Sequence, residues 1–128
     1  MIKGIGIDIV NVNRIKEVLS RWGDKFLKRV FSLNEIDYCL KKTYPHQHLA
    51  ARFAAKEAFL KALGTSLDKG ISLKDIEVKI DKNGVPFLTL NINKQYKTFK
   101  NIFLSISHER EFAVAIVILG EDNVFGNS

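Results

Sequence analysis

The sequence predicts an α+β fold in which a mostly antiparallel sheet packs against a long central helix and shorter N-terminal helices. Residues 50–64 have the composition of a helix throughout. Strand patterns, either alternating or continuously apolar, occur at residues 2–10, 76–80, 87–92, 102–107 and 111–119. The 128 residues, 46% of them hydrophobic, suffice for one domain with a substantial core but not for two. We therefore expect a single domain over residues 1–128.

The charge and cysteine content limit the classes of partner and compartment. Twenty Lys and Arg residues against fourteen Asp and Glu give a net charge of +6, which attracts nucleic acid, a phosphate-rich small molecule or an acidic protein equally well. The N-terminus lacks the pattern of a secretory signal, and no apolar run reaches the length of a membrane helix. Cys39 stands alone at an apolar helical position, so we expect it to pack in the core of a cytoplasmic protein.

The first predicted strand has two unlike faces. Ile5, Ile7 and Ile9 alternate with Gly4, Gly6 and Asp8, which is typical of a half-buried strand. Two glycines leave no side chains beside Asp8, so another backbone or a ligand can approach there closely. Alternatively, the glycines mark a bulge and Asp8 only caps the helix that follows.

Three short helices are expected after this strand. Asn11 or Asn13 can cap the first, whose outer face is basic and includes Arg14; such a face is either solvated or receives an acidic partner. Gly23 ends this helix, and Asp24 can cap the second. Ser32-Leu33-Asn34-Glu35 is a capping box for the third.

Residues 41–48 predict a loop, because Tyr44-Pro45 interrupts the helical pattern. His46 and His48 lie two positions apart in this segment. We reject a metal site here, since the sequence offers no suitable third ligand nearby.

The central helix carries few polar residues among its alanines and aromatic side chains. Arg52 and Lys56 share one edge, while Glu57 and Lys61 share another at i and i+4. An exposed Glu–Lys pair of this kind contributes only about 0.3 kcal/mol and is common. A carboxylate buried among methyl groups instead needs a cation or a metal to compensate its desolvation.

The C-terminal half predicts two hairpins. Lys82-Asn83-Gly84 turns between the strands at 76–80 and 87–92. His108 ends the strand at 102–107 just before a tight turn, where it is either a structural residue or a reactive group held by the sheet.

Asp8, Glu57 and His108 each lie among small or apolar residues, far apart in the sequence. Two carboxylates suit Mg²⁺, which completes its octahedron with water and substrate phosphate. A lysine and a histidine nearby would complete a site for phosphoryl chemistry.

Four segments occur in the order found in one known family. They are GIGIDIV (4–10) with Arg14, ARFAAKEAFLKALGT (51–65), NGVP (83–86) and SISHERE (105–111). Together they resemble the holo-acyl-carrier-protein synthase family of phosphopantetheinyl transferases, over residues 2–119. The resemblance implies Mg²⁺-dependent transfer of 4′-phosphopantetheine from coenzyme A to a serine of apo-acyl carrier protein, in support of fatty acid biosynthesis.

The resemblance also implies roles for individual residues. Asp8 and Glu57 match the metal ligands. Lys61 matches a catalytic lysine near the coenzyme A pyrophosphate, and His108 matches a histidine that contacts phosphate and can take a proton.

The remaining matched positions concern the nucleotide and the protein partner. Arg52, Gly64 and Thr65 fall where the family lines its nucleotide site. Arg14 matches the basic residue that meets the acidic carrier protein. Family members of this length are homotrimers with active sites between subunits, so we expect a trimer.

Two other functions fit the residues less well. Another Mg²⁺-dependent phosphotransferase or hydrolase could use the same carboxylates. A small basic nucleic-acid-binding domain is disfavoured, because the aromatic residues follow core periodicity instead of alternating with Lys and Arg on a strand face.

Overall fold

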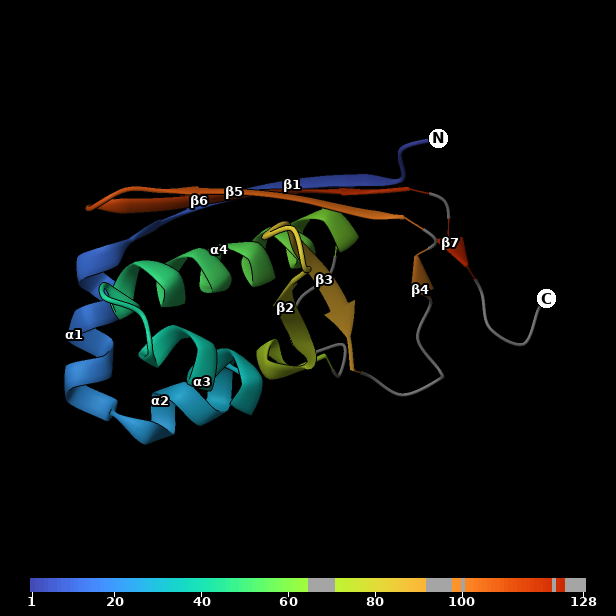
Figure 1. Ribbon diagram of the computed structural model, residues 1–128. Helices are drawn as coiled ribbons and strands as arrows, with labels where there is room; N and C mark the ends of the chain where they lie inside the picture. The colour runs from blue at the N-terminus through green and yellow to red at the C-terminus, as the bar shows by residue number, and fades with distance from the viewer. Residues whose placement is uncertain (65–70, 92–97, 100, 121, 124–128) are drawn as a thin grey trace.

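The computed structural model describes residues 1–64, 71–91, 98–99, 101–120 and 122–123. Figure 1 shows a three-stranded sheet lying along one long helix, with three shorter helices beyond it. The helical elements are α1 (Val12–Trp22), α2 (Asp24–Val30), α3 (Leu33–Leu40), α4 (Pro45–Leu63) and a 3-10 turn, η2 (Leu73–Asp75). The strands are β1 (Gly4–Asn11), β2 (Ile76–Ile80), β3 (Pro86–Leu90), β4 (Thr98–Phe99), β5 (Ile102–His108), β6 (Phe112–Leu119) and β7 (Asp122–Asn123).

The sheets are antiparallel, and the predicted α+β class is confirmed. The main sheet has the order β1-β6-β5, so the first strand pairs with the last long one. β2 and β3 form a separate hairpin, and β4 pairs with β7. Among the described helices, none combines the length and hydrophobicity needed to cross a bilayer.

Helix α4 is the centre of the core, as its composition predicts. Alanines, leucines and aromatic residues are buried on every side of it, because β1 and β6 cover one side while α1, α3 and β2 pack on the others. Cys39 is also fully buried and packs in this core, as expected.

Side-chain caps define the starts of α1 and α3. Asn11, and not Asn13, caps α1 by accepting hydrogen bonds from the backbone N–H groups of Asn13 and Arg14. The capping box of Ser32 and Glu35 is confirmed. The cap predicted at Asp24 is wrong by one position, since Gly23 precedes α2 and Asp24 is its first residue.

The predicted loop over residues 41–48 is wrong in its second half. Helix α4 already begins at Pro45, whose fixed φ and missing N–H suit the first position of a helix. His46 and His48 therefore lie in the first turn of α4. At its other end the helix stops at Gly64, which has φ 74° in the left-handed region, as predicted.

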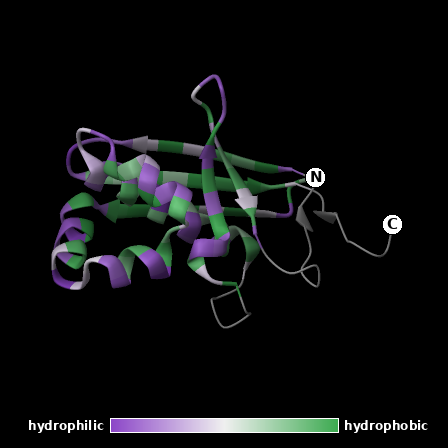
Figure 2. Ribbon diagram, turned by 60° about the horizontal axis from the view of Figure 1, so that its bottom comes forward, coloured by the Kyte–Doolittle hydropathy of each residue, from purple (hydrophilic) through white to green (hydrophobic). Residues whose placement is uncertain are grey.

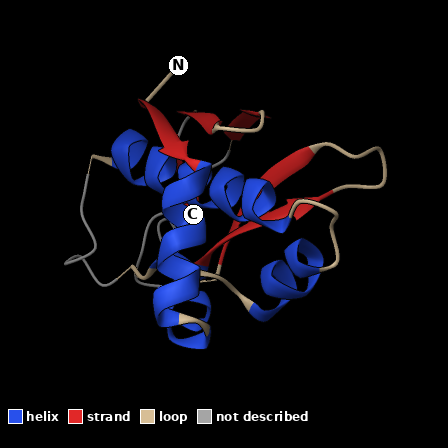
Figure 3. Cartoon of the chain, turned by 90° about the vertical axis from the view of Figure 1, so that its left-hand side faces the viewer, coloured by secondary structure: helices blue, strands red, loops and turns tan. Residues whose placement is uncertain are grey.

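The two faces of the main sheet differ in what covers them. Gly4, Gly6 and the alanines of β6 face α4, whereas Ile5, Ile7 and Ile9 are 59–62% exposed on the opposite face. Figures 1 and 3 show the described helices gathered on one side of this sheet. Figure 2 shows its strands as hydrophobic along most of their length. The main sheet therefore presents an apolar face that no described helix covers.

Candidate active site

Strand β1 packs against α4 without side chains in between. A Cβ atom on Gly4 would lie 2.0 Å from the carbonyl oxygen of Ala62, and one on Gly6 would lie 2.0 Å from that of Ala58. Only glycine fits at either position, so the close backbone approach expected from the sequence is confirmed. Asp8 is the next residue on this face of the strand, and the contact brings it against α4.

Asp8 meets Lys61 where the strand crosses the helix. Lys61 Nζ donates hydrogen bonds to Asp8 Oδ1 and to the carbonyl oxygen of Ile7, both at 3.0 Å. The Asp8 side chain is 17% exposed and that of Lys61 56%. Lys61 therefore pairs across to the sheet and not along the helix to Glu57, which was the simpler reading of the sequence.

Glu57 is the second carboxylate at this position. Partial burial raises the pKa of Glu57, and the negative charge of Asp8 raises it further, while Lys61 opposes the shift. Among the described residues, none donates a hydrogen bond to the Glu57 carboxylate. Its charge is thus poorly compensated by the protein itself.

Asp8 and Glu57 fit a magnesium ion. Two carboxylates that repel each other are relieved by a cation, and Mg²⁺ binds through one or two carboxylates plus water and phosphate oxygens. Within the described ranges, no group of three or more His, Cys, Asp or Glu side chains is arranged to hold a metal.

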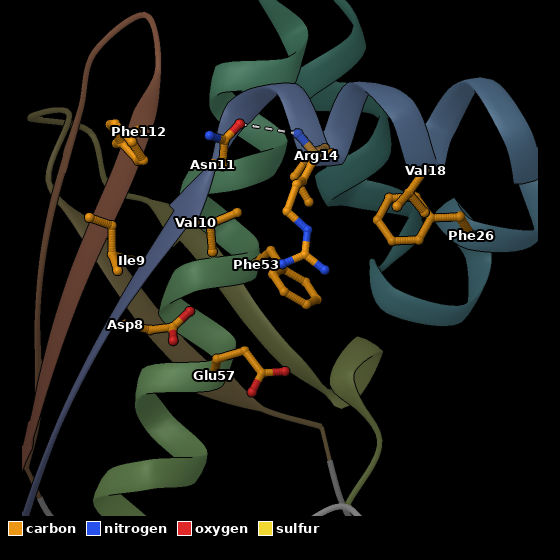
Figure 4. Close-up of a pocket in the computed structure, with 11 residues that line it drawn as sticks. Asp8, Ile9, Val10, Asn11, Arg14, Val18, Phe26, Phe53, Glu57 and Phe112 are labelled. Carbon is orange, nitrogen blue, oxygen red and sulfur yellow. Dashed lines mark hydrogen bonds between the residues drawn. The ribbon is translucent and has the colours of Figure 1, made fainter.

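Both carboxylates line a pocket of about 470 Å³ between β1, α1 and α4. Figure 4 shows Asp8 and Glu57 at one end of this pocket, Phe53 between Glu57 and Arg14, and Val18 and Phe26 at the other end. Apart from Arg14 and Asn11, the rest of the lining is apolar and includes Ile15. The pocket therefore combines two carboxylates at one end with an arginine and apolar walls.

Arg52 and His108 do not line this pocket but belong to a second group of side chains. Arg52 is 4% exposed, its Cζ lies 4.3 Å from the centroid of the Tyr38 ring, and its Nε has no hydrogen-bond partner among the described residues. His108 is exposed at the end of β5, where its ring centroid lies 5.1 Å from that of His48. A buried guanidinium with an unused donor can bind an anion such as phosphate.

Sequence reasoning missed Tyr38 and His48 in this group. His48 was dismissed as an exposed loop residue, yet it is half-buried in α4. Once the helix is extended back to Pro45, His48 and Arg52 stand at i and i+4 on one face, which is the signal that could have identified it.

Gly64, another of the predicted nucleotide residues, lies at the C-terminal end of α4. The backbone N–H of Gly64 donates to the carbonyl oxygens of Leu60 and Lys61, closing the last turn. Thr65 lies outside the described residues.

Comparisons with known proteins identify the family of the chain. Residues 4–117 match the model of the 4′-phosphopantetheinyl transferase superfamily. The chain is 51% identical over 126 residues to a holo-[acyl-carrier-protein] synthase of Halothermothrix orenii, covering 95% of this chain and 99% of the relative. It is 46% identical over 123 residues to one of Syntrophus aciditrophicus, covering 93% and 96%.

Solved structures of similar proteins share the fold. A holo-(acyl-carrier-protein) synthase from Bacillus anthracis, in complex with CoA (3′,5′-ADP), has a TM-score of 0.80 and 43% identity over 94% of this chain and 98% of its own. A Helicobacter pylori holo-[acyl-carrier-protein] synthase in complex with coenzyme A has a TM-score of 0.77 and 35% identity, covering 91% and 99%.

Proposed function

The chain belongs to the 4′-phosphopantetheinyl transferase superfamily, and we propose that it transfers 4′-phosphopantetheine from coenzyme A to a serine hydroxyl of apo-acyl carrier protein. The products are holo-acyl carrier protein and adenosine 3′,5′-bisphosphate. The observation that carries this proposal is the convergence of Asp8, Glu57 and Lys61 at the crossing of β1 and α4. The names of the similar enzymes, and the coenzyme A in two of the similar structures, support it.

Asp8 and Glu57 would hold a Mg²⁺ ion in this reaction. Bound there, the ion neutralises charge on the coenzyme A pyrophosphate. Lys61 has an exposed ammonium beside both carboxylates, so it can donate a hydrogen bond to a pyrophosphate oxygen while Asp8 and the Ile7 carbonyl hold it in place. Attack of a hydroxyl on phosphorus needs positioning and charge neutralisation more than a covalent intermediate, which suits this set of groups.

The second group of side chains suits the nucleotide. Arg52 offers a buried, unpaired donor, and His108 offers an exposed ring at a rigid strand end. We assign both to phosphate contacts, with His108 also able to accept the proton of the serine hydroxyl. Gly64 and Thr65, which follow α4, are assigned to the nucleotide site by their match to the family motif.

The pocket beside Asp8 suits the carrier protein. Its cation, Arg14, can pair with an acidic side chain, and its apolar walls can receive an apolar one. An acidic helix with an apolar stripe would satisfy both parts while bringing its serine to the carboxylates. The net charge of +6 favours such a partner.

We further propose that the enzyme is a cytoplasmic homotrimer. The apolar sheet face of Ile5, Ile7 and Ile9 continues onto Phe103, which is 58% exposed, and a second subunit would remove this surface from water. Light scattering at micromolar concentration should give three times the chain mass of 14.5 kDa. Ile7→Lys should dissociate the assembly, and a monomeric wild type would disprove this part.

Intact-mass spectrometry tests the transfer itself. Apo-acyl carrier protein incubated with the protein, coenzyme A and Mg²⁺ should gain the mass of one phosphopantetheine, and EDTA should prevent the gain. Asp8→Asn, which keeps the shape of the side chain without its charge, should also prevent it. No gain with several carrier proteins would leave hydrolase activity on a pyrophosphate as the next activity to measure.

A further inference from the structure

Two aromatic side chains connect the residues proposed to hold the nucleotide. Arg52 comes from α4 and His108 from the end of β5, so their spacing depends on tertiary contacts between these elements. Tyr38 of α3 lies under the Arg52 guanidinium at 4.3 Å, and its ring is 6.2 Å from that of His48. His48 in turn lies 5.1 Å from His108. The four side chains form a continuous row, Arg52, Tyr38, His48 and His108, across three elements.

We propose that Tyr38 and His48 are positioning residues, which hold Arg52 and His108 at the spacing and orientation that the phosphates of coenzyme A require. This inference rests on the proposed function. It adds two residues that touch neither the metal ligands nor the pocket beside them.

The contacts of Arg52 explain why it needs Tyr38. Arg52 is almost completely buried, and its Nε lacks a hydrogen-bond partner within the described part of the chain. Its guanidinium lies over the Tyr38 ring, so stacking orients it while leaving its donors free for a ligand. Lys42 Nζ also lies 4.4 Å from the centroid of this ring. The Tyr38 ring thus contacts two cations without neutralising the charge of either one.

The contacts of His48 explain its effect on His108. An exposed histidine at a strand end can rotate freely, whereas the edge-to-face contact at 64° restricts the His108 ring to one orientation. Burial lowers the pKa of His48, and the positive charges of His108, Arg52 and Lys42 lower it further. These effects favour the neutral form of His48, so its ring packs against His108 without placing a further charge beside it.

Steady-state kinetics of aromatic and non-aromatic variants tests this role. Tyr38→Leu and His48→Leu, which keep apolar volume but lose the ring, should lower kcat/KM for coenzyme A by about three- to tenfold, mainly through a higher KM. Tyr38→Phe and His48→Phe should restore it.

Matched controls separate positioning from general packing. Tyr44→Leu and His46→Leu change the same residue types nearby, and neither residue takes part in a ring contact recorded among the described residues. Both control variants should keep the wild-type KM. In a His108→Ala background, His48→Leu should cause no further loss, because the residue it orients is already absent.

Three results would overturn the inference. The first is a wild-type KM for coenzyme A in both leucine variants, and the second is a raised KM in the phenylalanine variants. The third is that His48→Leu lowers kcat/KM by the same factor with and without His108. If the wild type makes no holo-carrier protein, the proposed function fails instead, and the side-chain ¹⁵N signals of His108 then decide. His48→Leu should shift these signals and His46→Leu should not; no shift in either variant would refute the contact.

Discussion

Two lysines on helix α4 form ion pairs of opposite character. Lys56 Nζ lies 2.7 Å from Glu35 Oε1, and both side chains are fully buried. Lys61, five residues further along the helix, lies 3.0 Å from Asp8 Oδ1, with 56% of its side chain exposed. The same residue type on the same helix therefore serves the core in one case and the proposed active site in the other.

The number of acceptors around each ammonium group explains the difference. Lys56 Nζ has three N–H groups and donates to three acceptors: the Glu35 carboxylate and the carbonyl oxygens of Leu73 and Ile76. Lys61 Nζ donates to two acceptors within the described residues, Asp8 and Ile7. Lys56 is thus saturated and ties α3, η2 and β2 to α4, whereas Lys61 keeps a donor for a ligand.

The largest effect is expected from Lys56→Met. The substitution leaves the Glu35 carboxylate buried without its cation, which typically destabilises a protein by about 3–5 kcal/mol. Urea denaturation followed by circular dichroism measures the loss. Combining it with Glu35→Leu should recover part of the stability, since the unpaired Glu35 charge is then removed as well. A Lys56→Met midpoint equal to that of the wild type would remove the contrast between the two lysines.

Lys61→Met should show the reverse pattern. Because the Lys61 side chain is 56% exposed and solvent reaches its end of the pair, the free energy of unfolding should change by less than about 1 kcal/mol. Loss of a donor to the pyrophosphate should lower kcat for holo-carrier formation by about 100-fold. Lys79→Met is the matched control, since the exposed Lys79 forms only a 4.0 Å ion pair with Glu77, and the substitution should leave turnover unchanged. Equal turnover in the Lys61 and Lys79 variants would refute the assignment.

The sequence predicted neither of these ion pairs directly. Two glycines before Asp8 indicated that another backbone or a ligand could approach there, and in the structure this backbone is that of α4, which carries Lys61. Lys56 was recognised only as a polar residue on the helix. Its partner Glu35 belongs to a capping box 21 residues away, and that local role hid the tertiary one.

Strand alternation shows a second limit of the sequence. It predicted a half-buried β1 correctly but did not say which face is buried. Hydrophobicity alone favours burial of the isoleucines, yet the glycines face the core because α4 presents the small residues Ala58 and Ala62 to them. Alternation alone therefore does not determine which face of a strand packs against the rest of the chain.

Glu57→Gln sharpens the comparison, because Glu57 adds an uncompensated charge beside Lys61. Its pKa is raised above the ordinary 4.5, so the folded state binds the proton more tightly than the unfolded state. That contribution is complete below pH 4.5 and is lost as the pH rises through the raised value. At neutral pH without metal, Glu57→Gln should therefore raise Tm by a few degrees.

Magnesium provides the control for this variant. Added Mg²⁺ should raise the Tm of the wild type, because it compensates the two carboxylates, and should have little effect on Glu57→Gln. The exposed Glu17→Gln variant should respond to Mg²⁺ as the wild type does. A lower metal-free Tm in Glu57→Gln would mean that its charge is compensated after all.

The smallest effect on stability is expected from His48, in the first turn of α4, whose surroundings favour its neutral form. Tyr38 of α3, Lys42 after it, Arg52 of α4 and His108 of β5 face its ring, and its pKa lies below the ordinary 6.5. Between the lowered pKa of folded His48 and the ordinary 6.5, the unfolded chain binds more protons than the folded one. Stability therefore falls as the pH decreases below 6.5. His48→Phe should weaken this dependence without abolishing it, because burial and Lys16 also lower the pKa of His46. Urea midpoints measured from about pH 7.5 to about pH 5.5 test this, and equal slopes for His48→Phe and the wild type would show that burial and the surrounding positive charges do not keep His48 neutral.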